Sequence, residues 1–145
     1  MTAKKSIPGK DVDAVLVLYA PGIRSLALAA RDFVLESIPD ITEIVDVKAR
    51  IIGFGYSVRY ADQVCMLMPT KAGVNLGIAY AMELPDPKKI LEGTGKLHRH
   101  VKLKSEADLE NLALINLLKA ALERRERLKL ARKNAETPTA RTGGK

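Results

Sequence analysis

The sequence predicts an α+β domain in which a block of antiparallel strands lies between helices at the two ends of the chain. Three observations lead to this fold class. Apolar residues recur every three to four positions near both ends, apolar and polar residues alternate over the middle, and the turns between alternating segments are short. Short turns favour an antiparallel meander over a parallel sheet. The 145 residues suit one compact domain.

Helices are predicted before the strands. Asp11 is expected to cap a helix that begins at Val12, although the valines of VDAVLVLYA also suit a strand, and the pattern leaves both open. Pro21 opens a clearer helix, which Pro39 ends because the residue before a proline disfavours the α region. The core-facing stripe of that helix consists of Ile23, Leu26, Ala27, Ala30, Phe33 and Val34.

Alternation predicts strands over the middle of the chain. Val45, Val47, Ala49 and Ile51 occupy one side of the first strand, and the apolar set then moves to Ile52, Phe54, Tyr56, Val58 and Tyr60. Because a one-residue slip turns every side chain to the other face, we expect a bulge or tight bend near Gly53 and Gly55. Further strands are predicted over residues 64–68 and 74–80, joined by the turn PTKAG.

The C-terminal part is predicted to hold one more strand and the longest helix. LPDPKK ends the sheet and predicts a helical turn through Ile90 and Leu91, and a strand is expected over about residues 97–103. Ser105 and Asp108 form a capping-box pattern for a helix that runs on through LERRERLKLARK. The inward residues of this helix are expected to be Leu109, Leu112, Ile115, Leu118 and Leu122.

The folded domain is expected to span residues 11–133. Residues 1–10 are predicted to be a flexible N-terminus, and residues 134–145, which are polar and contain Pro and Gly, a disordered tail. No apolar run approaches the roughly 18 residues of a membrane span, and the start lacks the apolar segment of a secretory signal. With a single cysteine, Cys65, the sequence indicates a cytoplasmic protein without a membrane partner.

The formal net charge of +7 belongs to the two ends of the chain. Residues 1–10 carry +3, and residues 119–145 hold nine Lys or Arg and three Glu, a net +6, which leaves −2 for residues 11–118. A nucleic-acid reader concentrates positive charge on its binding face. The basic helix end, residues 119–133, is a possible contact for phosphates, but such a run is more often a solvated face.

The segment DPKKILEGTGKLHRHVKLK, residues 86–104, bears most on function. A Walker-type phosphate loop needs Gly, four residues, then Gly-Lys-Ser/Thr. Around Gly95 and Lys96 the required positions hold Ile90 and Leu97, which excludes a nucleotide-hydrolase loop. The backbone N–H groups of a Gly-Thr-Gly turn can still bind an anion. The alternative is a tight turn that needs its glycines for positive φ.

The strand after this turn adds cationic side chains. Alternation places Arg99 on one face with Leu97, Val101 and Leu103, and His98, His100, Lys102 and Lys104 on the other. A guanidinium on an aliphatic row needs a carboxylate or a ligand, because an unpaired buried charge is costly. The alternatives are a pair with an acid such as Glu92 and an exposed strand end. The predicted anion site comprises Gly93, Gly95, Lys96, Arg99, His100 and Lys102.

Other chemistries find less support in the sequence. His98 and His100 share a strand face, but a metal site needs a third or fourth ligand, so no metal and no cofactor are expected. Cys65 in QVCML is expected to be a buried filler rather than a reactive thiolate. The acidic residues are scattered, and no nucleophile stands out beside a base. The sequence therefore favours a binding protein over an enzyme and indicates no catalytic residues.

The segment LPDPKKILEGTGKLHRHVKLKSEADLENLALINLLKAAL resembles the C-terminal signature of the YdhG-like domain family, small bacterial proteins mostly of unknown function. The signature reads Leu-Leu-Glu-Gly-Ser/Thr-Gly-Lys, then Arg-His-Val-Lys, then a long helix. It is matched in order by Gly93, Gly95, Lys96, Arg99, His100, Val101 and Lys102. Residues 11–85 match less well, since the family usually has Tyr-Gly-x-Pro where this chain has GFGYSVRY.

The resemblance implies an antiparallel sheet of about five strands, covered on one face by N-terminal helices and a long C-terminal helix. One branch of the family resembles frataxin and is described as an intracellular iron chaperone. Iron needs clustered carboxylates, which the near-neutral centre and the lysine-rich strand do not obviously supply. We therefore expect a non-enzymatic module that binds a small anionic or phosphorylated ligand. Iron delivery is the alternative, and nucleic-acid binding comes behind both.

Overall fold

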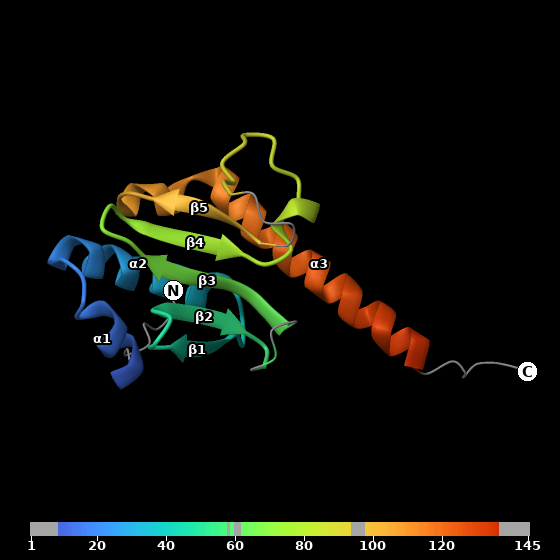
Figure 1. Ribbon diagram of the computed structural model, residues 1–145. Helices are drawn as coiled ribbons and strands as arrows, with labels where there is room; N and C mark the ends of the chain where they lie inside the picture. The colour runs from blue at the N-terminus through green and yellow to red at the C-terminus, as the bar shows by residue number, and fades with distance from the viewer. Residues whose placement is uncertain (1–8, 58, 60–61, 94–97, 137–145) are drawn as a thin grey trace, which may run out of the picture.

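The computed structural model describes residues 9–57, 59, 62–93 and 98–136 of the chain. Figure 1 shows an antiparallel sheet with α2 and α3 behind it, so the helices cover one face and leave the other open. The five strands follow one another in the order β1-β2-β3-β4-β5. Their bounds are β1 Thr42–Asp46, β2 Ile51–Gly55, β3 Gln63–Pro69, β4 Val74–Ile78 and β5 Arg99–Leu103. The predicted α+β class with an antiparallel meander is confirmed.

Two helices precede the sheet, α1 (Lys10–Leu16) and α2 (Pro21–Ser37). The segment that suited either a helix or a strand is therefore helical, but Asp11 does not cap it. The cap position is Gly9, and Asp11 lies in the first turn. The predictions for α2 are confirmed at both ends, with Pro21 in the first turn and the last helical residue two before Pro39. Its buried positions include Leu26, Ala27, Ala30 and Val34.

A hairpin, and not a bulged strand, explains the change of phase near residue 51. β1 ends at Asp46, and a turn over residues 47–50 reverses the chain into β2. The Asp46 carboxylate accepts a hydrogen bond from Ala49 N–H at 3.0 Å, and Arg50 adopts a positive φ of 59°. A register shift does occur between Phe54 and Gly55, where β2 meets β3. Val58 and Tyr60, expected to continue the strand, lie outside the described residues.

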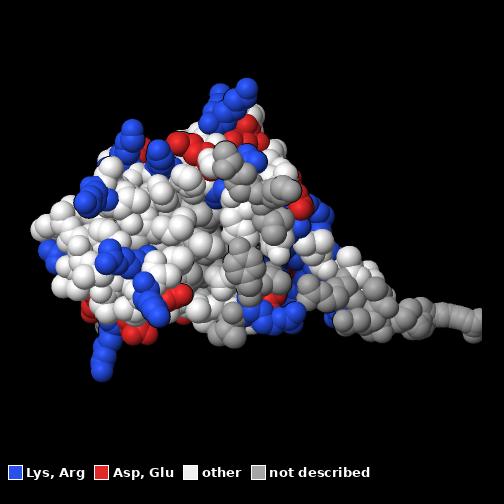
Figure 2. Space-filling view, viewed as in Figure 1, with Lys and Arg blue, Asp and Glu red and all other residues white. Residues whose placement is uncertain are grey.

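The core lies between the helices and one face of the sheet. In-register partners across this face include Phe54 with Cys65 and Leu67 with Leu76, and all four side chains are buried. The opposite face carries the row Gly53, Met66, Gly77. A Cβ at Gly77 would lie 3.0 Å from Met68 Cε and 3.1 Å from Met66 Cγ, so the two methionines lie across this glycine. Figure 2 shows mainly uncharged side chains over the middle of the open face and Lys and Arg towards its rim.

The C-terminal helix begins later than the sequence predicts, and a different set of its residues faces the core. The capping box of Ser105 and Asp108 is present, but it opens the short 3₁₀ helix η3 (Glu106–Glu110). The α-helix α3 spans Leu112–Glu136. Its buried side chains are Leu114, Leu117, Leu118 and Ala121, whereas Leu112 is 71% exposed. The expected inward position of Leu112 is therefore wrong.

Two other predictions concern the connection and the ends. The helical turn expected at Ile90 and Leu91 is absent; a 3₁₀ turn, η2 (Ala81–Glu83), follows the end of β4 at Ile78 after two turn residues. Residues 134–136, expected in the tail, belong to α3, and Lys10 belongs to α1. Residues 1–8 and 137–145 lie outside the described part of the chain. Over the part that is described, no helix is both long and apolar enough to cross a membrane.

Candidate functional site

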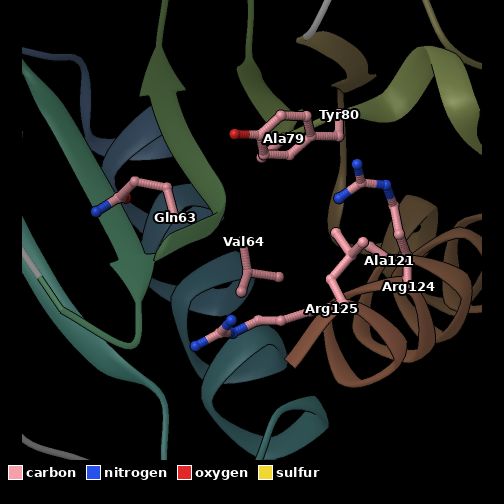
Figure 3. Close-up of a pocket in the computed structure, with 8 residues that line it drawn as sticks. Gln63, Val64, Ala79, Tyr80, Ala121, Arg124 and Arg125 are labelled. Carbon is pink, nitrogen blue, oxygen red and sulfur yellow. The ribbon is translucent and has the colours of Figure 1, made fainter. Parts of the chain in front are cut away.

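A pocket of about 160 Å³ opens between α3 and the end of the sheet where β3 begins and β4 ends. Figure 3 shows the pocket between the Tyr80 ring, the Val64 side chain and two arginines that project from α3. Its floor is apolar and its rim is polar. The lining residues are Gln63, Val64, Ala79, Tyr80, Ala121, Arg124, Arg125 and Leu128.

The geometry of α3 brings the two arginines to this pocket. Residues three and four apart lie on the same side of an α-helix. The buried row at positions 114, 117, 118 and 121 therefore continues through 124, 125 and 128. Near the end of the sheet, this row carries Arg124 and Arg125 in place of aliphatic residues. Most described residues of the basic helix end are exposed, as the solvated-face alternative expects, but Arg124 and Arg125 are only partly exposed.

Arg124 is fixed by two contacts with the segment after β4. Its Nε donates a hydrogen bond to Glu83 Oε1 at 2.6 Å, and its Cζ lies 4.4 Å from the centre of the Tyr80 ring. Tyr80 has a positive φ of 56° and opens the 3₁₀ turn that carries Glu83. A non-glycine residue in the left-handed region is uncommon and is often found at functional sites. This turn brings Glu83 and Tyr80 to the same arginine.

Arg125 lies against a different ring. Its Cζ is 4.2 Å from the centre of the Tyr56 ring, within the range of a cation–π interaction. Burial raises the pKa of Tyr56, while the charge of Arg125 acts in the opposite direction. The Tyr56 hydroxyl donates a hydrogen bond to the Pro39 carbonyl at 3.3 Å, which ties the ring to the chain after α2. The tyrosine therefore keeps its proton and presents a ring face to the guanidinium.

The Arg125 Nε–H is the unusual polar group of this region. The nitrogen is buried, and among the described residues it has no hydrogen-bond partner. A buried donor left without a partner costs about 1–3 kcal/mol. A ligand with an acceptor oxygen in the adjacent pocket would remove that cost. Guanidinium groups present planar forks of N–H donors that match carboxylate and phosphate oxygens, so the site is suited to an anion.

The residues predicted to form an anion site do not all lie together in the structure. Gly93 has a φ of 109°, as the turn hypothesis requires, while Gly95 and Lys96 lie outside the described residues. In β5, Arg99 is paired with Ile78 on the core-facing row, and His100 is paired with Gly77 on the open face. Lys102 shares the His100 face, and its Nζ lies 3.4 Å from Glu92 Oε1. Arg99 therefore does not share a sheet face with His100 and Lys102.

The start of β5, which belongs to the segment predicted to bind an anion, nevertheless lies next to the pocket. The His98 and Tyr80 rings are 5.9 Å apart, and burial lowers the pKa of His98. Arg99 is paired with Ile78, the residue immediately before Ala79 of the pocket lining. The start of β5 thus borders the pocket lined by Arg124 and Arg125. Of the cationic residues considered from the sequence, Arg99 therefore lies close to the pocket, whereas His100 and Lys102 lie on the open face of the sheet.

Other reactive groups are placed away from this region or are unreactive. Cys65 is fully buried in β3, and burial raises the pKa of its thiol to about 12, so it is a filler of the core as expected. Over the described residues, no group of three or more His, Cys, Asp or Glu side chains is arranged to hold a metal ion. Comparison of the chain with protein-family models, curated proteins and solved structures found no match.

The sequence contained a signal for the missed arginines. If the inward row is counted from Leu114 and not from Leu109, positions 124 and 125 fall on the core side of α3. Two cations on a core-facing row need partners or a ligand. Like Arg99 in its strand, this pair of adjacent arginines on a core-facing row indicates a binding site.

Proposed function

We propose that this protein is a non-enzymatic binding module for a small anion and that the pocket beside Arg124 and Arg125 is its binding site. The observation that carries the proposal is the pair of guanidinium groups, each stacked on a tyrosine ring, at the rim of one pocket. Stacking fixes the direction of the donors before a ligand arrives, which lowers the entropy cost of binding. The buried Arg125 Nε–H supplies a donor that lacks an acceptor among the described residues.

The start of β5, within the segment that resembles the YdhG-like family, forms the other border of the proposed site. His98 contacts Tyr80, and Arg99 lies one strand position from the pocket lining, so a larger phosphorylated ligand would extend towards these two residues. Membership of that family remains part of the proposal. So does a cytoplasmic location, for which the support is the single buried, unpaired cysteine.

The proposal is tested by replacing Arg125. Arg125→Met keeps much of the stacking volume but removes the charge and the donors. A charge-assisted hydrogen bond contributes about 1.5–3 kcal/mol, so the affinity for a bound anion should fall at least tenfold. Binding is measured as the rise in melting temperature of the full chain with phosphate, sulfate, acetate and benzoate. The matched control is Arg127→Met, an exposed arginine on the same helix.

The outcomes separate the functions considered. Stabilisation of wild type and Arg127→Met by at least one of these anions, and its loss in Arg125→Met, supports the proposal. No stabilisation of wild type by any of them contradicts it. The alternative from the resemblance, iron delivery, predicts Fe²⁺ binding with a defined stoichiometry in the absence of such anions. Nucleic-acid binding predicts an affinity that falls steeply with salt concentration.

A further inference from the structure

We infer that the anion is a monocarboxylate with a compact apolar body, about the size of a benzene ring. This inference rests on the proposed function and adds the chemical class of the ligand. Three properties of the arginine pocket lead to it: the net charge of the fixed groups, the volume of the cavity and the chemistry of the floor.

The two charged residues that line the pocket, taken with the ion-pair partner of one of them, sum to a single positive charge. The pocket has two guanidinium groups, but Arg124 is already paired with Glu83 at 2.6 Å. Among the described residues no ion pair engages Arg125. The set of Arg124, Arg125 and Glu83 therefore carries a net charge of +1. A carboxylate would balance this charge, whereas a phosphate dianion would leave an excess negative charge at a partly buried site, which is unfavourable.

The cavity has the volume of a small compact body. Its 160 Å³ is close to the roughly 150 Å³ of an engineered protein cavity that binds benzene. Two small side chains on facing elements, Ala79 after β4 and Ala121 on α3, create this space. Both are buried, at 5% and 7% exposure. A bulkier residue at either position would fill the volume.

The floor of the cavity is apolar where the rim is charged. Val64, Ala79 and Ala121 are buried, and Leu128, which is 46% exposed, adds an aliphatic side chain at the edge of the pocket. The amide of Gln63 is directed elsewhere: its Oε1 would lie 2.9 Å from a Cβ at Gly53, and Figure 3 shows the amide pointing away from the arginines. A ligand with a charged head and an apolar body would match both parts of the pocket. Inorganic anions would leave the floor uncovered.

Figure 3 shows the Arg124 guanidinium beside Tyr80 and the Arg125 guanidinium on the other side of Val64. In the proposed arrangement the carboxylate accepts hydrogen bonds from the Arg125 fork, including its buried Nε–H. The body of the ligand contacts Val64 and Ala121. Because a bidentate guanidinium–carboxylate pair is directional as well as strong, neutral molecules of the same shape should bind much more weakly.

Calorimetric titration of the full chain with benzoate, benzamide and phosphate tests the inference. Benzoate should bind wild type at least tenfold more tightly than either benzamide or phosphate. Ala121→Leu fills the cavity and should weaken benzoate binding at least tenfold. Ala131→Leu, an exposed position on the same helix, is the matched control and should bind as wild type does. Circular dichroism verifies that each variant folds.

A second measurement needs no variant. In wild type, nuclear Overhauser effects should connect benzoate ring protons with the Val64 methyl groups. Phosphate binding without benzoate binding would overturn the monocarboxylate inference and leave the proposed function standing. Benzamide binding as tight as benzoate binding, or benzoate contacts that do not involve Val64, would also overturn it. If none of phosphate, sulfate, acetate and benzoate binds, the proposed function and the inference both fail.

Discussion

At the scale of single residues, one buried ion pair joins the helix layer to the edge of the sheet. Arg31 of α2 is the one charged side chain among the described residues that is fully buried, at 2% exposure. Its Nε and Nη2 donate hydrogen bonds to the two carboxylate oxygens of Glu43 in β1, at 2.5 and 3.1 Å. A second acid, Asp32, lies 3.9 Å from Nη1. A bidentate pair of this kind fixes orientation as well as distance.

Removal of one member of this pair should be more harmful than removal of both. Glu43→Ala leaves the Arg31 guanidinium buried without its main partner, and we expect the free energy of unfolding to fall by about 3–5 kcal/mol. The double variant Arg31→Met/Glu43→Leu replaces the pair with apolar side chains and should recover most of the loss. Urea denaturation of the three proteins measures both changes. Equal stability of Glu43→Ala and wild type would show that the pair is not an essential contact.

At the scale of elements, helix α3 belongs to both the core and the candidate site. One row of positions, three and four residues apart, is aliphatic from Leu114 to Ala121 and cationic at Arg124 and Arg125. The same row of α3 positions therefore packs on the core as far as Ala121 and lines the pocket from there on. Any change that rotates this helix would move the arginines away from their tyrosines.

The phase of α3 provides a prediction that compares two leucines in the same turn. Leu114 is fully buried, so Leu114→Ala should reduce the free energy of unfolding by about 2–5 kcal/mol. Leu112 is 71% exposed, so Leu112→Ala should change it by less than about 0.5 kcal/mol. Chemical denaturation of both variants measures these values. A larger loss of stability for Leu112→Ala than for Leu114→Ala would mean that Leu112 faces the core, as the sequence predicts.

Sequence reasoning succeeded for elements whose signal is local. Pro21 and Pro39 delimit α2, and the later strands were predicted from alternation within them. It failed where a single hydrophobic periodicity was extended across a residue whose backbone conformation is not helical. Asn111 has a ψ of 118°, outside the helical region, so the spacing from Leu109 to Leu112 carries no phase information for α3. The turn after Asp46 caused the same error in the sheet.

The candidate site could be predicted only in part, for a related reason. A glycine turn and an arginine in a strand are visible in a short segment of sequence. The arginine pocket, by contrast, depends on pairs such as Arg124 and Glu83, which are 41 residues apart in the chain. Which ring meets which guanidinium follows from tertiary packing, and the spacing within one segment does not determine it.

At the scale of the whole molecule, the order of the strands implies a particular sequence of folding. Every strand is paired with its neighbour in the chain, so the sheet can form by closing short loops. Helix α3 contacts strands that are distant in sequence, and we expect it to dock after the sheet has formed. Low sequence separation between contacting residues favours fast folding.

Two core leucines test this order. Leu67→Ala in β3 and Leu117→Ala in α3 each remove a buried side chain. The ratio of the change in folding activation free energy to the change in stability should be about 0.5–0.8 for Leu67→Ala and about 0–0.3 for Leu117→Ala. Stopped-flow folding and unfolding in urea give both ratios. A higher ratio for Leu117→Ala would mean that α3 belongs to the folding nucleus.

The linear strand order also determines how copies of the chain meet one another. An unclosed sheet has two edges, here β1 and β5, and an open edge is a template for pairing with another strand. The outer side of β5 is already engaged at one point, because His100 and Glu92 exchange both of their backbone hydrogen bonds there. β1 is therefore the more open edge, and it carries the acidic residues Glu43 and Asp46. Two copies paired through β1 would bring these acids together, and like charges on neighbouring strands are unfavourable. Charge therefore disfavours a two-fold symmetric dimer through this edge.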